Sequence, residues 1–298
     1  MTEQTSNFAD MFNLNAEDFE QKTNESVVYK VKPSAGKNGV YSSLIRFVPW
    51  HKDPKNSYVD KWEAWLQNPI TKKGMSVDCA SSIGEPSELM DTFWGLQNSD
   101  DPELKEKAKY FSRKRHFYAV IQILKDENRP ELEGKLKIFK FGIKIFDKIQ
   151  AELKPEFGKP HVPFDPTNGK PFHIKCKEVG GYTNYDESKF LEESVPVFVG
   201  KDKKFDTMEE LGKFLQENSP NLDDFSFRPW GEREQTHFDQ LKELVIPSVS
   251  NSVKTATTND SKHNDPLVDD VPELTAKDAP VVDDKKEANN SNEFEFNL

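Results

Sequence analysis

The chain has 298 residues, of which 35% are hydrophobic and 31% are charged, and its formal net charge is −11. This length is sufficient for a packed core, but the low apolar content predicts that part of the chain is disordered. The sequence contains no uncharged apolar run of roughly the 18 residues that a membrane span needs, and its start lacks the basic and apolar regions of a signal peptide. We therefore expect a soluble protein that is neither secreted nor bound to a membrane.

The charge is distributed unevenly along the chain. Residues 105–177 hold 18 Lys and Arg against 9 Asp and Glu, a net charge of +9, whereas residues 248–298 hold 5 against 11, a net charge of −6. A basic block of this kind can attract a polyanion even when the whole protein is acidic. The net charge therefore does not exclude a nucleic-acid partner.

The two cysteines, Cys79 and Cys176, lie far apart and form no CxxC pair. This pattern is typical of a reducing compartment and provides no disulfide framework. We expect each of them to be a small buried apolar side chain.

The first half of the chain predicts a flexible arm, a hairpin and an inserted lobe. Residues 1–25 have scattered polar groups without periodicity, so we expect a loosely ordered arm. The run VVYKV, the turn signal Asn38-Gly39 and the run YSSLIRFV together predict a β-hairpin. Residues 50–104 are less regular, with one expected helix from Ser87 to Gln97, and they read as an inserted lobe.

The middle of the chain predicts paired strands. The runs FYAVIQIL, at 117–124, and KLKIFKF, at 135–141, are rich in β-forming residues and are joined by a polar loop. In the second run Leu136 and Ile138 should face the core, while Lys137 and Phe139 should form a basic and aromatic face. A helix should follow Gly142, and FHIKCKEV at 172–179 should form a further strand that places Lys175 and Lys177 on one face.

Two amphipathic helices, around Met208–Leu215 and Phe238–Leu244, should close the core. From about Pro247 the composition predicts a disordered acidic tail. Its end, EFEFNL, joins carboxylates to Phe294, Phe296 and Leu298. We expect this segment to anchor partner proteins, and we expect the tail to compete with phosphate for the basic block.

Cations and aromatic rings coincide in the basic block. Single-stranded DNA is held by cations that follow its phosphates and by rings on which its bases stack. Lysines that alternate with core residues are more often an ordinary solvated face, so the pattern alone is weak. The residues that combine both features are Arg113, Lys114, Arg115, Phe117, Tyr118, Lys137, Phe139, Lys140, Lys175 and Lys177.

The segment GGYTNYDESKF adds Tyr182 and Tyr185 on a glycine-led loop that is suited to base stacking. The alternative is a tight turn whose tyrosines pack on the core. Asp186 and Glu187 suggest a metal-dependent nuclease, but one acidic pair supplies too few ligands for such a site. No nucleophile–base constellation or phosphate-binding loop is apparent either, so we expect no enzymatic activity and no cofactor.

The segments SLIRFVP, SRKRHFYAVIQILKD, EGKLKIFKFGIKIFDKI and FHIKCKEVGGYTNYDESKFL resemble the helix-destabilising single-stranded DNA-binding proteins of T-even and related tailed phages. The resemblance covers roughly residues 40–195 and is most specific through NYDESKFL. It implies an OB-type β-barrel with an attached lobe, and a basic cleft lined by aromatic rings. The positions that match the cleft of the family are Arg46, Arg113, Lys114, Tyr118, Tyr182 and Tyr185.

The sequence departs from that family in two places. The lobe of the family holds zinc through one histidine and three cysteines, but only Cys79 matches a ligand here, so we expect no metal. The family also begins with a basic arm that produces cooperative filaments. Residues 1–25 contain Lys22 as their only basic side chain against six acidic ones, which leaves the mode of self-association along DNA open.

These observations predict a mainly β fold with helices. We expect an OB-type core at 26–246, with the inserted lobe at about 50–104, between the arm at 1–25 and the tail at 247–298. The expected function is sequence-independent binding of single-stranded DNA in phage replication, recombination and repair, in the cytoplasm of the infected bacterial host. Phage replication and recombination proteins are the expected partners of the tail. An RNA-binding translational regulator on the same scaffold is the alternative, because base stacking does not distinguish ribose from deoxyribose.

Overall fold

The computed structural model describes residues 26–200 and 203–246, so both the expected arm and the expected tail lie outside the described residues. The strands are β1 Val28–Tyr29, β2 Val40–Phe47, β3 Tyr58–Gln67, β4 Gly74–Asp78, β5 Arg113–Lys125, β6 Leu136–Phe141, β7 Phe172–Val179, β8 Tyr182–Asn184, β9 Lys189–Phe190, β10 Phe198–Val199 and β11 Lys203–Lys204. The α-helices are α1 Glu88–Gln97, α2 Pro102–Lys107, α3 Ile143–Leu153, α4 Met208–Asn218 and α5 Glu232–Val245. Short 3₁₀ helices include η4 Ala80–Ile83, η5 Ala108–Phe111 and η7 Leu222–Phe225.

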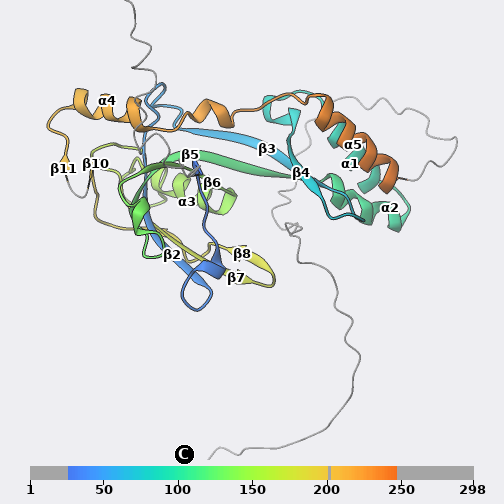
Figure 1. Ribbon diagram of the computed structural model, residues 1–298, viewed down its shortest axis with the longest axis horizontal. Coiled ribbons are helices and arrows are strands. Elements are labelled where there is room, and N and C mark those ends of the chain that lie inside the picture. The colour runs from blue at the N-terminus through green and yellow to red at the C-terminus, as the bar shows by residue number, and fades with distance from the viewer. Residues whose placement is uncertain (1–25, 201–202, 247–298) are drawn as a thin grey trace, which may run out of the picture.

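A nine-stranded sheet forms the body of the molecule (Figure 1). Its order is β1-β6-β5-β2-β7-β8, with β3 joined to β5, β4 to β3 and β9 to β7. The long strand β5 pairs with β3 through its first half and with β2 through its second half. In the described part of the chain β1 and β8 do not pair, so the sheet does not close into a barrel. The predicted sheet-rich fold with peripheral helices is confirmed.

The predicted hairpin at the start of the core is wrong. Asn38 and Gly39 do form a tight turn with positive φ angles of 55° and 72°. However, β1 pairs in parallel with β6, through Val28 opposite Ile138, and β2 pairs with β5 and β7. The predicted turn is confirmed, but a turn does not determine which strands flank it.

The predicted pairing of the two central runs is confirmed, because β5 and β6 are antiparallel neighbours. The predicted exposed face of β6 is wrong. Phe139 packs in the main apolar cluster with an exposure of 1%, and the ammonium group of the buried Lys137 donates a hydrogen bond to the carbonyl of Ser26 at 3.1 Å. Both faces of β6 are covered, so lysine next to phenylalanine does not mark a solvated surface here.

Three apolar clusters organise the fold. The main cluster lies between the sheet and α3 and contains Phe47, Phe117 and Phe172. A second cluster joins β4, α1, η5 and α5 beyond the far end of β3 and β5, and it contains Phe111 and Phe238 (Figure 1). A third cluster packs α4 and η7 against the opposite face of β5 and β6. The five helices of the described residues are each too short or too polar to cross a membrane.

The predicted helices are confirmed at Glu88–Gln97, Ile143–Leu153, Met208–Asn218 and Glu232–Val245. Thr207 caps α4 by accepting a hydrogen bond from the amide of Glu210 at 3.2 Å. In α5 the buried apolar face ends with Val245, whereas the predicted Leu244 is exposed. Cys79 and Cys176 are both fully buried, as predicted.

Candidate nucleic-acid interface

The ladder of β3 and β5 carries the candidate residues on its two faces. Arg113, Arg115 and Phe117 alternate with Lys114, His116 and Tyr118 along β5, so the two sets point to opposite sides. We call the side on which Phe117 contacts α3 the α3 face. We call the other side, on which Tyr118 contacts η7, the strap face, because residues 219–231 cross it between α4 and α5.

A tryptophan lies beside two arginines on the α3 face. Trp62 in β3 is directly opposite Arg115 in β5, so both side chains share this face. The guanidinium carbons of Arg113 and Arg115 lie 4.1 Å and 5.9 Å from the centre of the Trp62 ring. Arg115 also forms a two-point ion pair with Asp60, with its Nε at 2.8 Å from Oδ1. The side chains of Arg113, Trp62 and Arg115 are half-buried, so they remain accessible to a ligand.

Helix α3 continues this surface toward the β7–β8 hairpin (Figure 1). The Phe117 ring stacks on Phe146 of α3 with centroids 3.9 Å apart. One turn of the helix then presents Lys144 and Lys148, whose ammonium groups lie 3.1 Å from the Asp186 carboxylate and 3.2 Å from its carbonyl oxygen. The arginines of β5 and the loop after β8 are thus joined through α3.

The hairpin supplies further cations and rings. Lys175 and Lys177 lie on one face of β7 and both contact the carboxylate of Glu187. Tyr182 is exposed at 43%, whereas Tyr185 is half-buried and packs against the main cluster. The stacking hypothesis therefore suits Tyr182 best, and Tyr185 combines a structural contact with partial access.

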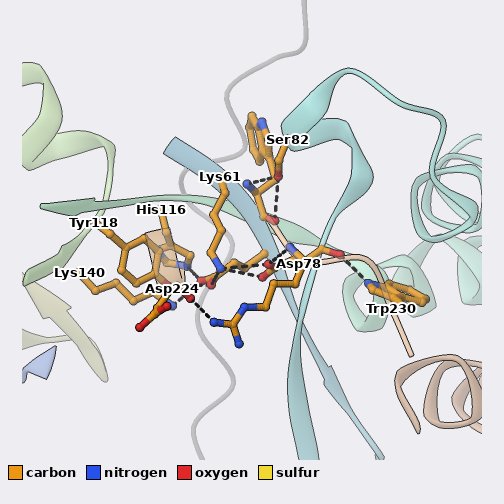
Figure 2. Close-up of polar contacts among 11 residues, drawn as sticks. Lys61, Asp78, Ser82, His116, Tyr118, Lys140, Asp224 and Trp230 are labelled. Carbon is orange, nitrogen blue, oxygen red and sulfur yellow. Dashed lines mark hydrogen bonds and ion pairs between the residues drawn. The ribbon is translucent and has the colours of Figure 1, made fainter. Parts of the chain in front are cut away.

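The strap face holds a buried ionic network (Figure 2). The carboxylate of Glu63 contacts Lys61 at 3.2 Å, Lys140 at 2.5 Å and the hydroxyl of Tyr118 at 2.6 Å. Lys61 also contacts Asp78 at 2.9 Å. Two lysines therefore meet two carboxylates, and their charges are neutralised inside the protein.

The titration of these groups reflects their surroundings. Burial alone would raise the pKa of Glu63, but Lys140 and the hydrogen bonds from Lys140 and Tyr118 outweigh burial and lower this pKa to about 2. Burial, together with Lys140, lowers the pKa of His116 to about 3, so the imidazole is neutral at pH 7. Near neutral pH the network thus contains a charged carboxylate next to a neutral histidine.

The strap covers the aromatic ring of this network. Phe225 stacks on Tyr118 with centroids 5.1 Å apart and an interplanar angle of 28°. The amide of Arg228 donates to Asp78 Oδ2 at 2.9 Å, and the indole of Trp230 donates to the Asp78 carbonyl at 2.6 Å. Tyr118 therefore has no exposed ring face, and a base could not stack on it in this arrangement.

Arg46 is fully buried, so this structure does not present it to a ligand, and its predicted contact with DNA stays a prediction. Its guanidinium donates to the carbonyls of Phe47, Asp165, Pro166 and Val195. Burial lowers its pKa to about 10, although Asp165 acts in the opposite direction. A Cβ at Gly169 would collide with the Arg46 guanidinium and lie 2.8 Å from the Asp165 carbonyl, so the space around the arginine requires a glycine here.

Three further predicted contact residues are also buried. Phe117, Phe139 and Lys137 have exposures of 0%, 1% and 7%. In this arrangement a base or a phosphate cannot reach these three side chains without unpacking the core, and their contact with DNA stays a prediction. Of the other predicted positions, Lys114, Tyr118 and Lys140 lie on the strap face, and the remaining ones adjoin the α3 face or the hairpin.

Several residues of these surfaces were missed in the sequence. Trp62, Lys144 and Lys148 belong to the α3 face, and Lys61 and Glu63 to the strap face. The spacing of Lys144 and Lys148 by four residues on a predicted helix was a usable signal. Trp62 gave no signal of its own, because its role depends on the pairing register with β5.

The surroundings of Cys79 do not fit a structural zinc ion. Its sulfur contacts the hydroxyls of Ser81 at 3.0 Å and Ser87 at 3.4 Å, and neither hydroxyl is a usual zinc ligand. Within residues 26–200 and 203–246, no group of three or more His, Cys, Asp or Glu side chains is placed to hold a metal ion. Apolar contacts among Leu89, Phe111 and Phe238 hold this region together instead.

A chelator is accordingly expected to leave the thermal unfolding temperature unchanged, because no metal–ligand bonds contribute to stability. The measurement is differential scanning calorimetry of the full chain, purified without added metal, with and without EDTA. Stoichiometric zinc in an elemental analysis, together with a fall in unfolding temperature in EDTA, would contradict this expectation.

Comparisons with known proteins place the chain in a family. A model of the family described as "gp32 DNA binding protein like" matches residues 37–229, which include β2 to β11, α4 and the strap as far as Pro229. Proteins named "Single-stranded DNA-binding protein" from Enterobacteria phages T4 and T2 are each 33% identical over 176 residues, covering 56% of this chain and 55% of theirs. The chain thus spans about half the length of these curated relatives. Because the family model covers well over half of the residues, the chain belongs to the gp32-like family of DNA-binding proteins.

Proposed function

We propose that the protein binds single-stranded DNA without sequence preference and without catalysis, and that the α3 face carries this binding. The observation that supports this most directly is the group of Arg113, Trp62 and Arg115, which joins an aromatic platform to two cations. Aromatic platforms beside cations hold single strands because every base has a π-face and every nucleotide a phosphate. The names of the T4 and T2 relatives support the same ligand.

The energetics favour the α3 face over the strap face. Phosphates that contacted Lys61 or Lys140 would have to displace the buried carboxylates of Glu63 and Asp78, and breaking buried ion pairs is costly. The Arg115–Asp60 pair is about one-third exposed on both sides. Exposed pairs contribute only about 0–1 kcal/mol, so a phosphate can replace Asp60 at small cost.

The nuclease alternative has weaker support. Asp186 and Glu187 point to different lysines, Lys144 for the first and the pair Lys175 and Lys177 for the second. Carboxylates that act as metal ligands converge on one point. We therefore propose that these carboxylates organise cations rather than a metal.

The wider role follows from the same proposal. We propose that the protein coats and protects single strands during phage DNA replication, recombination and repair in the cytoplasm of the infected host. We further propose that the open sheet is a variant of the OB-type barrel and that residues 26–246 form the DNA-binding core with its inserted lobe. The acidic tail at 247–298, through Phe294, Phe296 and Leu298, would recruit replication and recombination proteins.

Titration of the full chain with poly(dT), poly(U) and duplex DNA at several salt concentrations tests the proposed function. We expect the tightest binding to poly(dT), and a linear fall of log K with log salt, with a slope of about −0.7 for each phosphate contact. Tighter binding to poly(U) would support the RNA-binding alternative. Equal affinity for duplex DNA would contradict the proposal.

Replacing Trp62 or Tyr182 with alanine should weaken binding to oligothymidylate by about 1–3 kcal/mol each, because each change removes a stacking surface. The loss should be similar for oligomers of other bases. Trp94, a half-buried tryptophan of the second cluster, offers a matched control, and its replacement by phenylalanine should leave affinity unchanged. Binding titrations followed by anisotropy of a labelled oligomer measure all three variants. Unchanged affinity in both test variants would place the interface on another surface.

A further inference from the structure

The cations of the hairpin are held by an acidic side chain in a built arrangement. Lys175 and Lys177 are two residues apart on β7, so their side chains leave the same face of the strand. Their ammonium groups converge on the two carboxylate oxygens of Glu187, with Lys175 at Oε2 and Lys177 at Oε1. Two lysines that meet at one anion form a small binding position for a single negative charge.

The turn that carries Glu187 is fixed by hydrogen bonds of its own. The hydroxyl of Ser188, which is 1% exposed, accepts from the amide of Lys175 at 2.9 Å and donates to its carbonyl at 3.1 Å. On the other side of Glu187, the side chain of Asn184 bonds both the amide and the carboxylate of Asp186. The loop therefore holds Glu187 opposite the two lysines.

The Glu187 carboxylate is ionised at neutral pH, and a phosphate could replace it between the two lysines. Hydrogen bonds from Lys175 and Lys177 lower the pKa of Glu187 to about 2, so it is ionised throughout the neutral range. The side chains of all three residues are about 40% exposed. A phosphodiester has the same single charge and offers similar acceptor oxygens, so it can take the place of the carboxylate.

We propose that Glu187 is an internal competitor for a DNA phosphate, which occupies the position between Lys175 and Lys177 until a single strand displaces it. This inference rests on the proposed function, and it makes Glu187 a residue that limits affinity. Because Glu187 is tethered beside the lysines, it competes at a high effective concentration. When DNA displaces Glu187 from the lysines, the freed carboxylate takes up a cation from solution. This uptake offsets part of the release of cations from the DNA, so the salt dependence of binding becomes weaker.

The substitution Glu187→Gln tests this role in the full chain. We expect affinity for oligothymidylate at low salt to rise about fivefold, which corresponds to an exposed ion pair at the upper end of its range. The slope of log K against log salt should become steeper by up to about 0.7, the value of one further phosphate contact. Thermal unfolding of the same variant shows whether its fold is unchanged.

Glu178→Gln provides the matched control. Glu178 is an exposed carboxylate on the same strand, and the described residues include no ion-pair partner for it. The Glu178→Gln substitution changes the net charge by the same amount as Glu187→Gln. It should change the affinity for oligothymidylate by less than about twofold, as expected for a general surface charge. An effect of Glu187→Gln that is no larger than this, or a loss of affinity, would overturn the proposal.

The double variant Lys175→Gln and Lys177→Gln separates this inference from the proposed function. Weaker binding of the double variant, with unchanged binding of Glu187→Gln, would leave the hairpin in the interface and reject the competitor. Unchanged binding of all three variants would remove the hairpin from the interface and would reject the competitor as well.

Discussion

Replacement of Arg46 with methionine is expected to lower the free energy of unfolding by about 3–5 kcal/mol, because it removes the hydrogen bonds of a fully buried guanidinium with four backbone carbonyls. The carbonyls of Phe47, Asp165, Pro166 and Val195 all accept from this one guanidinium. Those of Asp165 and Pro166 also accept from the backbone amides of Gly169 and Val197. Urea unfolding followed by circular dichroism measures the change. The loss of DNA binding should then follow the unfolded fraction.

Two further variants make the Arg46 prediction specific. Gly169→Ala should also destabilise the protein, because the added methyl group would collide with the Arg46 guanidinium. Arg113→Met, on the half-buried α3 face, should change stability by no more than about 1 kcal/mol. An Arg46→Met variant that is as stable as the parent but binds DNA poorly would restore the direct contact that the family resemblance suggested.

Replacement of Glu63 with glutamine should destabilise the protein by about 3 kcal/mol at pH 7, because a pKa lowered from 4.5 to about 2 represents that much preferential stabilisation of the carboxylate in the folded state. A carboxyl group with a lowered folded pKa stabilises the protein above its unfolded pKa. This contribution is therefore full above about pH 4.5 and is lost as the pH falls toward 2.

The pH dependence gives the control for Glu63. Chemical unfolding between pH 7 and pH 3 should show a smaller loss of stability in the Glu63→Gln variant than in the parent protein. Glu178→Gln is the matched substitution at an exposed carboxylate, and it should leave the acid-induced loss of stability close to that of the parent. A Glu63→Gln variant with parental stability at pH 7 would show that the network contributes nothing.

The sequence predicted the helices and strands better than it predicted which strands pair with one another. Helices α1, α3, α4 and α5 follow from apolar spacing, and β5 and β6 follow from two β-rich runs joined by a polar loop. The parallel pairing of β1 with β6 joins Val28 to Ile138, which are far apart in the chain, and no local pattern encodes it. For the same reason the hairpin suggested by Asn38-Gly39 was wrong.

The candidate site was predicted only in part, because tertiary packing decides which of its residues are exposed. The cluster around Arg113 and Arg115 is visible in the sequence, but alternation along β5 sends its members to two faces that differ in burial. Whether a lysine of a strand faces water or a buried carboxylate depends on which other segment of the chain packs against that face of the sheet. Lys140 meets Glu63 from β3, and Tyr118 meets Phe225 from the strap, and neither contact can be read from local sequence.

Photocrosslinking tests the central claim that a single strand lies along the α3 face. The full chain would be irradiated with an oligothymidylate that carries 5-iododeoxyuridine, and the modified residues would be identified by mass spectrometry. We predict crosslinks at Trp62, Tyr182 and Tyr185, and their loss at high salt as the complex dissociates. Crosslinks confined to Tyr118, Phe225 and other strap-face residues would contradict the account.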